Sequence, residues 1–120
     1  MMLLAIALGG VLGSLGRFGV AEAFGLWDGQ GIPLATFSVN MAGCLAIGLI
    51  MGSGWAEGAA WRRPFLVTGV LGGFTTFSAF AVQALRLSEE SPLSAIAYVA
   101  ASLILGLVAA AAGLAIGRAA

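Results

Sequence analysis

Polar side chains recur inside stretches of this sequence that are otherwise apolar. They are Thr36, Asn40, Thr75, Thr76, Ser78, Gln83, Tyr98 and Ser102. Nearly all can donate a hydrogen bond, and none carries a charge. A proton-coupled carrier usually needs a carboxylate inside the membrane, and a cation channel usually needs rings of carbonyls or carboxylates. Neutral donors instead suit a small, strongly hydrated anion, whose water must be replaced by many short donors.

Two phenylalanines, Phe77 and Phe80, lie three residues apart among these donors. A phenyl ring has a positive edge, so ring edges can flank an anion while hydroxyls and amides donate to it. The alternative interpretation is an ordinary pair of core phenylalanines at helical spacing. The alternative for Asn40 is a hydrogen bond that joins two helices. The glycines and hydroxyls at 72–78 favour the ion-lining interpretation.

The stretch 69–80, Gly-Val-Leu-Gly-Gly-Phe-Thr-Thr-Phe-Ser-Ala-Phe, lies in the middle of a membrane-length apolar segment. A glycine pair is a common place for a helix to kink or open. Freed backbone at membrane depth is tolerated only where protein buries it or a watery cavity meets it. We therefore expect this helix to be broken near its middle, at 72–75, and to line something polar. Unwound carbonyls often hold Na⁺, but spacing alone leaves that open.

The composition indicates a membrane protein of one domain, residues 1–120. Hydrophobic residues make up 61% of the chain and charged residues 8%, against roughly 25% charged in soluble domains. There is no histidine and one cysteine, Cys44. This excludes histidine acid–base catalysis, the usual His/Cys metal sites and an intrachain disulfide, so we expect no enzyme. A net charge of zero gives no sign of nucleic-acid binding.

Four apolar segments, at about 2–21, 32–54, 64–87 and 93–117, predict an all-α membrane protein with four transmembrane helices. Each is near the roughly 20 residues that a bilayer demands. An even count places both termini on one side, with Arg62, Arg63 and Arg118. The other side holds Arg86 and, if its side chain reaches that interface, Arg17, so the positive-inside bias is almost nil. Such a chain can insert either way, which would let two copies pair antiparallel.

Smaller signals concern packing and the helix ends. Glycines 9, 13 and 16, and the pair 48 and 52, recur at helical spacing and predict close helix approach. Ser91-Pro92 predicts the start of the last helix, and Trp27 and Asp28 are expected at the membrane interface. Arg17 has two interpretations of equal weight: a side chain that reaches the interface, or a charge that attracts anions at a vestibule.

On three motifs the sequence resembles the CrcB/Fluc family of fluoride channels, over essentially the whole chain. They are residues 13–18, Gly-Ser-Leu-Gly-Arg-Phe; residues 36–43, Thr-Phe-Ser-Val-Asn-Met-Ala-Gly; and the stretch 69–80. The last is the most specific of the three. The second adds independent support at the expected place.

The resemblance implies a passive fluoride-selective channel in the bacterial plasma (inner) membrane, protecting the cell from fluoride. It implies an antiparallel, dual-topology homodimer with two pores. It implies a structural Na⁺ at the dimer centre, on the backbone carbonyls of Gly72 and Thr75. The implied fluoride-binding residues are Asn40, Phe77, Phe80, Thr36, Ser78, Thr76, Tyr98 and Ser102, with Arg17 at the vestibule. The expected partners are fluoride, sodium, a second copy of the chain and the lipid bilayer.

Three positions depart from the family pattern. Gly106 replaces a serine, Gln83 a frequent glutamate, and Ala79 a threonine or serine. In the family these positions belong to the outer part of the polar residues that line the ion path, so the resemblance is weaker there than at the three motifs. One rival function is a small dual-topology multidrug transporter, which would need a glutamate in the first segment, where none precedes Glu22. The other is a structural membrane assembly subunit, which explains the glycines but not the hydroxyls beside the phenylalanines.

Overall fold

The structure is a computed structural model, and it describes residues 1–25 and 31–120. Trp27 and Asp28, expected at the membrane interface, lie outside the described residues. The regular elements within these ranges are all helical. They are α1 Met2–Phe24, α2 Leu34–Ser53, the short η2 Trp55–Glu57, the π-helix η3 Pro64–Leu71, α3 Gly72–Phe74, α4 Phe77–Glu90 and α5 Pro92–Ala119.

The described chain contains four helical segments long and apolar enough to cross a membrane, as the sequence predicts. They are Met2–Phe24, Leu34–Ser53, Pro64–Glu90 and Pro92–Ala119, with mean hydropathy between 1.7 and 2.4. The third comprises η3, α3 and α4 in succession. A run of π-helix such as η3 is rare and is frequently found at functional sites.

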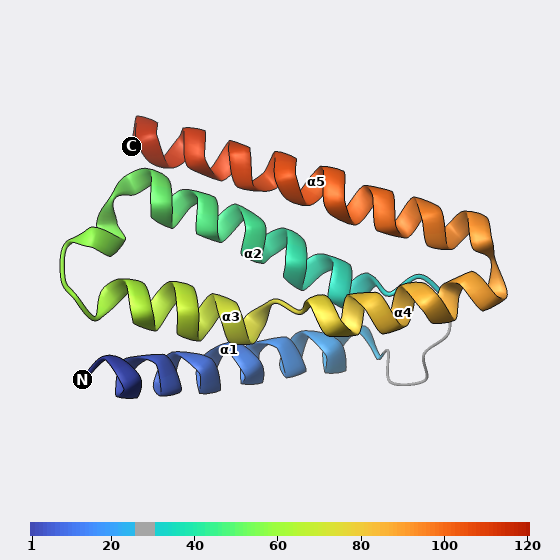
Figure 1. Ribbon diagram of the computed structural model, residues 1–120, viewed down its shortest axis with the longest axis horizontal. Coiled ribbons are helices and arrows are strands. Elements are labelled where there is room, and N and C mark those ends of the chain that lie inside the picture. The colour runs from blue at the N-terminus through green and yellow to red at the C-terminus, as the bar shows by residue number, and fades with distance from the viewer. Residues whose placement is uncertain (26–30) are drawn as a thin grey trace.

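The helices lie side by side in an elongated body of 47 × 30 × 20 Å (Figure 1). Helix α1 packs along η3 and α3, and α2 packs along α5. Helix α4 returns to α5 at the far end, so the third segment contacts a different neighbour on each side of its middle. Both termini and the connection at 54–63 lie at one end (Figure 1).

Glycines allow the two main helix pairs to approach closely. A Cβ added at Gly113 on α5 would lie 2.9 Å from the Leu49 nitrogen of α2 and 3.1 Å from the Gly48 Cα. A Cβ at Gly9 on α1 would lie 3.0 Å from the Gly69 Cα of η3. The prediction that the glycine faces serve helix packing is confirmed at Gly9 and Gly48.

The exterior is strongly apolar and the interior is small. Leu3, Leu93 and Leu107 are each more than 70% exposed, and many other large apolar side chains are exposed with them. Monomeric soluble proteins rarely expose apolar surface on this scale. Together with the four long apolar helices, this describes a multi-pass membrane protein.

The turn between α4 and α5 is capped as the sequence predicts. The Ser91 hydroxyl accepts a hydrogen bond from the Ser94 amide at 3.3 Å, and Pro92 occupies the first helical position. Phe80 and Leu87 of α4 then pack with Ala95 and Tyr98 of α5 in one buried cluster. This hairpin sets the position of Tyr98 beside the middle of the third segment.

Candidate functional site

The third segment leaves helical geometry at two residues, Thr75 and Thr76. Thr75 has φ −82° and ψ 159°, and Thr76 has φ −149° and ψ 120°, both extended. The sequence placed the interruption at 72–75, but Gly72 and Gly73 remain helical. Gly73 serves close packing instead, because a Cβ there would lie 3.1 Å from the Ser14 amide nitrogen of α1.

Asn40 of α2 holds the interruption from across the molecule. Its Oδ1 accepts a hydrogen bond from the Thr76 amide at 2.8 Å, and its Nδ2 donates to the Thr76 carbonyl at 3.0 Å. The side-chain amide thus pairs with both backbone groups of one extended residue, as a neighbouring strand would. Satisfying such backbone groups within the protein is the condition for non-helical chain at membrane depth.

Two carbonyls lose their helical donors at this point. In a continuous helix the Thr76 amide would donate to the Gly72 carbonyl, but it donates to Asn40 instead. The Ala79 amide would donate to the Thr75 carbonyl, but it donates to the Thr76 hydroxyl at 3.2 Å. The Asn40 and Thr76 side chains therefore divert the donors of the Gly72 and Thr75 carbonyls, the same two that the family resemblance implies as cation ligands.

The hydroxyls at the interruption point in different directions. Thr75 donates its hydroxyl hydrogen to the Leu71 carbonyl at 2.8 Å, so that hydroxyl is engaged with its own helix. Thr76 caps α4, and its Oγ1 lies 3.4 Å from the Ser78 Oγ. The N-terminus of α4 brings partial positive charge to the same place.

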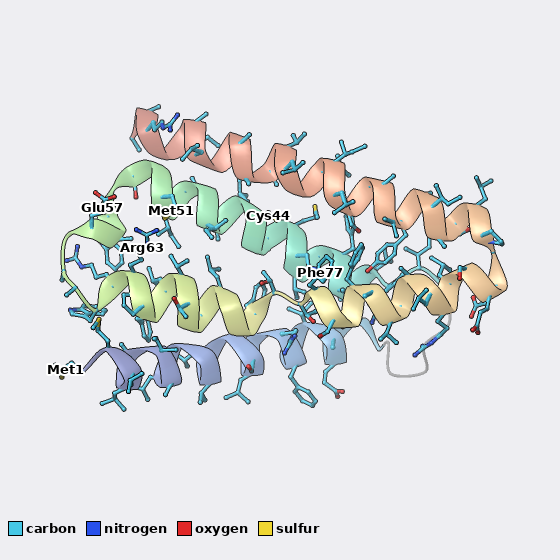
Figure 2. The ribbon with its side chains drawn as sticks, viewed as in Figure 1. Met1, Cys44, Met51, Glu57, Arg63 and Phe77 are labelled. Carbon is cyan, nitrogen blue, oxygen red and sulfur yellow. The ribbon has the colours of Figure 1, made fainter. Side chains whose placement is uncertain are left out.

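Three aromatic rings form a row that runs away from the interruption. The ring centroids of Phe77 and Phe80 are 5.6 Å apart, and those of Phe80 and Tyr98 are 5.3 Å apart, with interplanar angles of 44° and 47°. Phe80 is 7% exposed, whereas Phe77 is 75% exposed. Figure 2 shows Phe77 near the centre of the molecule, at the start of α4. So exposed a phenylalanine is not a core residue of this chain.

Polar atoms of α4 and α5 are buried without a partner among the described residues. The Tyr98 hydroxyl, the Ser102 hydroxyl and the Gln83 Oε1 are buried and make no hydrogen bond to the described residues. Buried polar groups in proteins nearly always have a partner, so each exception requires an explanation. The two hydroxyls can donate to an anion or exchange hydrogen bonds with water.

Two hollows meet at the interruption. The first, the arginine cavity, has a volume of about 470 Å³, and Arg17, Thr36, Thr76 and Gln83 are among its lining residues. The second, the aromatic groove, has a volume of about 450 Å³. Its lining includes Asn40, Gly72, Thr75, Thr76, Phe77, Phe80 and Ser102. Thr76 lines both hollows, so the interruption lies between them at this residue.

The structure therefore divides the residues nominated from the sequence. Arg17 and Thr36 lie in the arginine cavity, away from the phenylalanines. Tyr98 reaches the site through its ring contact with Phe80, and Ser78 through its hydroxyl contact with Thr76. Among the described residues, no group of three or more His, Cys, Asp or Glu could hold a metal ion. Oxygen atoms of the backbone and of neutral side chains are the other cation ligands that the groove offers.

Some lining residues were missed by reasoning from the sequence. Ser14, Arg86 and Glu90 line the arginine cavity with Arg17. Ser14 lies three residues before Arg17 and Glu90 four residues after Arg86, so each pair shares a helix face. The sequence could have shown these pairings. It could not show that the two pairs line one cavity, because that depends on how α1 and α4 are placed in the fold.

A comparison with family models decides the family. Residues 4–114 match the family described as CrcB-like protein, Camphor Resistance (CrcB). The chain belongs to the CrcB family. A curated relative from Paracoccus denitrificans is 49% identical over 116 residues, covering 96% of this chain and 93% of the relative. A second, from Rhodospirillum centenum, is 44% identical over 121 residues, covering 98% and 95%. Both relatives are named fluoride-specific ion channel FluC.

The three positions at which the resemblance implies a departure from the family pattern also have places in the structure. Gln83 and Ala79 line the arginine cavity. Gly106 is buried on α5, and a Cβ there would lie 3.4 Å from both the Cys44 Sγ and the Met41 Cε of α2. A serine at 106 would therefore need these two flexible side chains to give way slightly.

Proposed function

We propose that this chain forms a passive, fluoride-selective channel. The observation that carries the proposal is the interruption at Thr75–Thr76, held by Asn40 and set between the arginine cavity and the aromatic groove. A lipid-facing helix has no use for such an interruption. Membership of the CrcB family, and relatives named as fluoride-specific ion channels, support the proposal.

Neutral donors would replace the water around fluoride along this route. Asn40 has a second amide hydrogen that the Thr76 carbonyl does not use. The Tyr98 and Ser102 hydroxyls need partners. The edges of Phe77 and Phe80 would flank the anion with weak positive charge. Arg17 would raise the local concentration of anions at the mouth, because a charged cleft focuses counter-ions.

A second, antiparallel copy of the chain is the proposed partner. The aromatic groove lies open at the surface of one chain, with the exposed Phe77 beside polar groups of Asn40 and Thr75. Such a mixture is poorly suited to lipid tails, because polar groups at membrane depth face protein or water. The nearly equal numbers of arginines at the two ends would permit both orientations.

A structural Na⁺ at the dimer centre fits the carbonyls that this chain provides. Gly72 and Thr75 lose their helical donors and line the open groove. Unwound carbonyls at mid-membrane recur as Na⁺ ligands. Two carbonyls from each of two copies would supply an oxygen set. The ion would add a fixed positive charge that lowers the cost of anions nearby.

The proposed location is the bacterial plasma membrane, with export of fluoride as the role. Hydrogen fluoride is a weak acid that enters uncharged and dissociates in a near-neutral cytoplasm. A negative-inside potential drives the trapped anion outward by about 2.3 kcal/mol per 100 mV. No pump is needed, which agrees with a set of donors that lacks a titratable carboxylate.

The deciding experiment is ion efflux from liposomes that contain only this protein. Fluoride and chloride are followed in parallel after a potassium diffusion potential is set. We expect fast fluoride efflux and no chloride efflux. Retained fluoride, or chloride leaving as fast, would refute the channel. A multidrug-type transporter would instead move organic cations in exchange for protons, and an assembly subunit would move neither.

A further inference from the structure

We propose that Asn40 and Thr76 are positioning residues that create the cation site by withholding helical donors from two carbonyls. This rests on the proposed function, because it concerns the Na⁺ of that same site. It gives Asn40 a role other than that of a pore donor. It also makes Asn40 the residue that joins the proposed ion path to the proposed cation.

The choice at Thr76 is between two hydrogen-bonded arrangements. In one, its amide returns to the Gly72 carbonyl and the third segment becomes a continuous helix. In the other, which the structure shows, the Asn40 amide takes both backbone groups, at 2.8 Å and 3.0 Å. Backbone groups without partners are costly inside a membrane. Removing the Asn40 amide therefore favours closure of the helix and loss of the free Gly72 carbonyl.

The Thr76 side chain withholds the helical donor from the second carbonyl, that of Thr75. Its Oγ1 accepts from the Ala79 amide at 3.2 Å, and so keeps that amide from the Thr75 carbonyl. Side-chain capping of this kind is what ends or begins a helix at a chosen residue. The two diversions are independent, since one uses the backbone of Thr76 and the other its hydroxyl. Each can be removed without touching the other.

Helix α2 has a glycine where the extended residues pack against it. Gly43 lies one turn after Asn40, and a Cβ there would collide with the Thr75 methyl group. Asn40 and Gly43 thus hold the extended residues against α2: Asn40 bonds the backbone of Thr76, and Gly43 leaves room for the Thr75 methyl group. Asn40 also lines the aromatic groove with Phe77 and Ser102. Its second amide hydrogen remains for that groove, so one side chain serves both sites.

The test measures Na⁺ dependence of stability, separately from ion flux. The thermal unfolding of the purified full-length protein is followed in detergent across a Na⁺ series, at constant ionic strength with N-methylglucamine. We expect Na⁺ to stabilise the native protein. In Asn40→Leu and in Thr76→Val, the half-saturating Na⁺ concentration should rise about tenfold or more, as for loss of groups that orient metal ligands. Thr76→Ser keeps the hydroxyl and should keep the native Na⁺ dependence.

Ser102→Ala is the matched control, because Ser102 lines the same groove but bonds neither carbonyl nor its donor. It is expected to lower fluoride flux while leaving the Na⁺ series unchanged. An unchanged Na⁺ series in both Asn40→Leu and Thr76→Val overturns the inference. So does a native protein indifferent to Na⁺. If Asn40→Leu fails to fold, the near-isosteric pair Thr76→Val and Thr76→Ser decides. Absent fluoride flux from the native protein would refute the channel, yet the Na⁺ series would still judge the positioning roles.

Discussion

The rings of Phe80 and Tyr98 lie against each other between α4 and α5, with centroids 5.3 Å apart. Both side chains are more than 90% buried. The contact fixes the Tyr98 hydroxyl in a buried place where it has no partner among the described residues. One residue thus supplies both packing, through its ring, and an unused donor, through its hydroxyl. Substitutions can separate the two.

Tyr98→Phe should lower fluoride flux without lowering stability. Leaving a buried hydroxyl unpaired costs about 1–3 kcal/mol, so its removal should increase the free energy of unfolding or leave it unchanged. Hydrogen bonds to a charged group contribute about 1.5–3 kcal/mol, which corresponds to roughly a tenfold loss of fluoride flux or more. Denaturant unfolding and liposome efflux measure the two effects. Native flux in Tyr98→Phe would remove Tyr98 from the ion path.

Phe77→Ile separates an ion-lining role from a packing role. Phe77 is 75% exposed in the chain, and substitutions at exposed positions usually change stability by less than about 0.5 kcal/mol. We expect the chain to fold and fluoride flux to fall, because the weakly positive edge of one ring no longer flanks the anion. Phe80→Ile is the comparison: Phe80 is buried, so that change should also destabilise the fold. Efflux is measured after cross-linking has shown that the proposed dimer forms in the variant as in the native protein. Native flux in Phe77→Ile would leave that ring without a part in conduction.

Helical spacing in the sequence predicts the packing faces but not the position of the interruption. The period of an α-helix is the same in every protein, so the spacing of the glycines at 9, 13, 48 and 52 is enough to assign them to faces. The glycine pair at 72–73 suggests a break by its composition, but Gly73 is used for contact with α1. Thr76 is extended because Asn40, 36 residues away, bonds its backbone. No local pattern reveals such a long-range partner.

The candidate site was likewise only partly readable from the sequence. Residue types indicated a set of neutral donors and gave Asn40, Phe77 and Phe80. The division into two hollows was not predictable, because it depends on α1 packing on one side of the third segment and α5 on the other. Thr36 and Arg17 consequently lie in the arginine cavity, apart from the aromatic row.

Gly13→Ala should destabilise the fold, and Gly10→Ala should not. A Cβ at Gly13 would collide with the Val70 carbonyl and lie 2.8 Å from the Phe74 amide nitrogen, whereas nothing lies within 4 Å of a Cβ at Gly10. Overpacking typically costs about 1–3 kcal/mol. A glycine inside a helix with room for a Cβ gains roughly 0.5–1 kcal/mol when it is replaced by alanine. Unfolding of both variants under the same conditions gives the comparison, and equal effects would contradict the close packing of α1 on the third segment.

Arg17→Gln distinguishes the two interpretations of that arginine. If its charge draws anions into the arginine cavity, fluoride flux should fall several-fold at low salt. The deficit should shrink at high salt, because the Debye length falls from about 30 Å at 0.01 M to about 3 Å at 1 M. Arg17→Lys keeps the charge and should behave as the native protein does. A deficit independent of salt, or none, would favour an arginine that only reaches the membrane interface.

The two ends of the elongated helical body carry opposite net charge. This difference affects how two copies of the chain would pair. The end with the 54–63 connection holds Arg62, Arg63 and Arg118 against one glutamate, Glu57. Figure 2 shows Glu57 and Arg63 at the end where the first residue lies. The other end holds Arg17 and Arg86 against three glutamates, at 22, 89 and 90. In an antiparallel pair each membrane face would bring a net positive end beside a net negative one. In a parallel pair like charges would meet.

Glutamate substitutions at the two ends should therefore shift the proposed dimerisation in opposite directions. Acidic residues contribute little to membrane orientation, so glutamine replacements change the pairing charge without changing topology. Glu89→Gln with Glu90→Gln should weaken the dimer, whereas Glu57→Gln should strengthen it slightly. Surface charges of this kind are worth no more than about 1 kcal/mol each and are screened by salt. The dimer fraction is measured by subunit counting in vesicles at increasing lipid dilution, at low and high salt. Shifts of the same sign at the two ends, or shifts that persist at high salt, would show that these charges do not guide pairing.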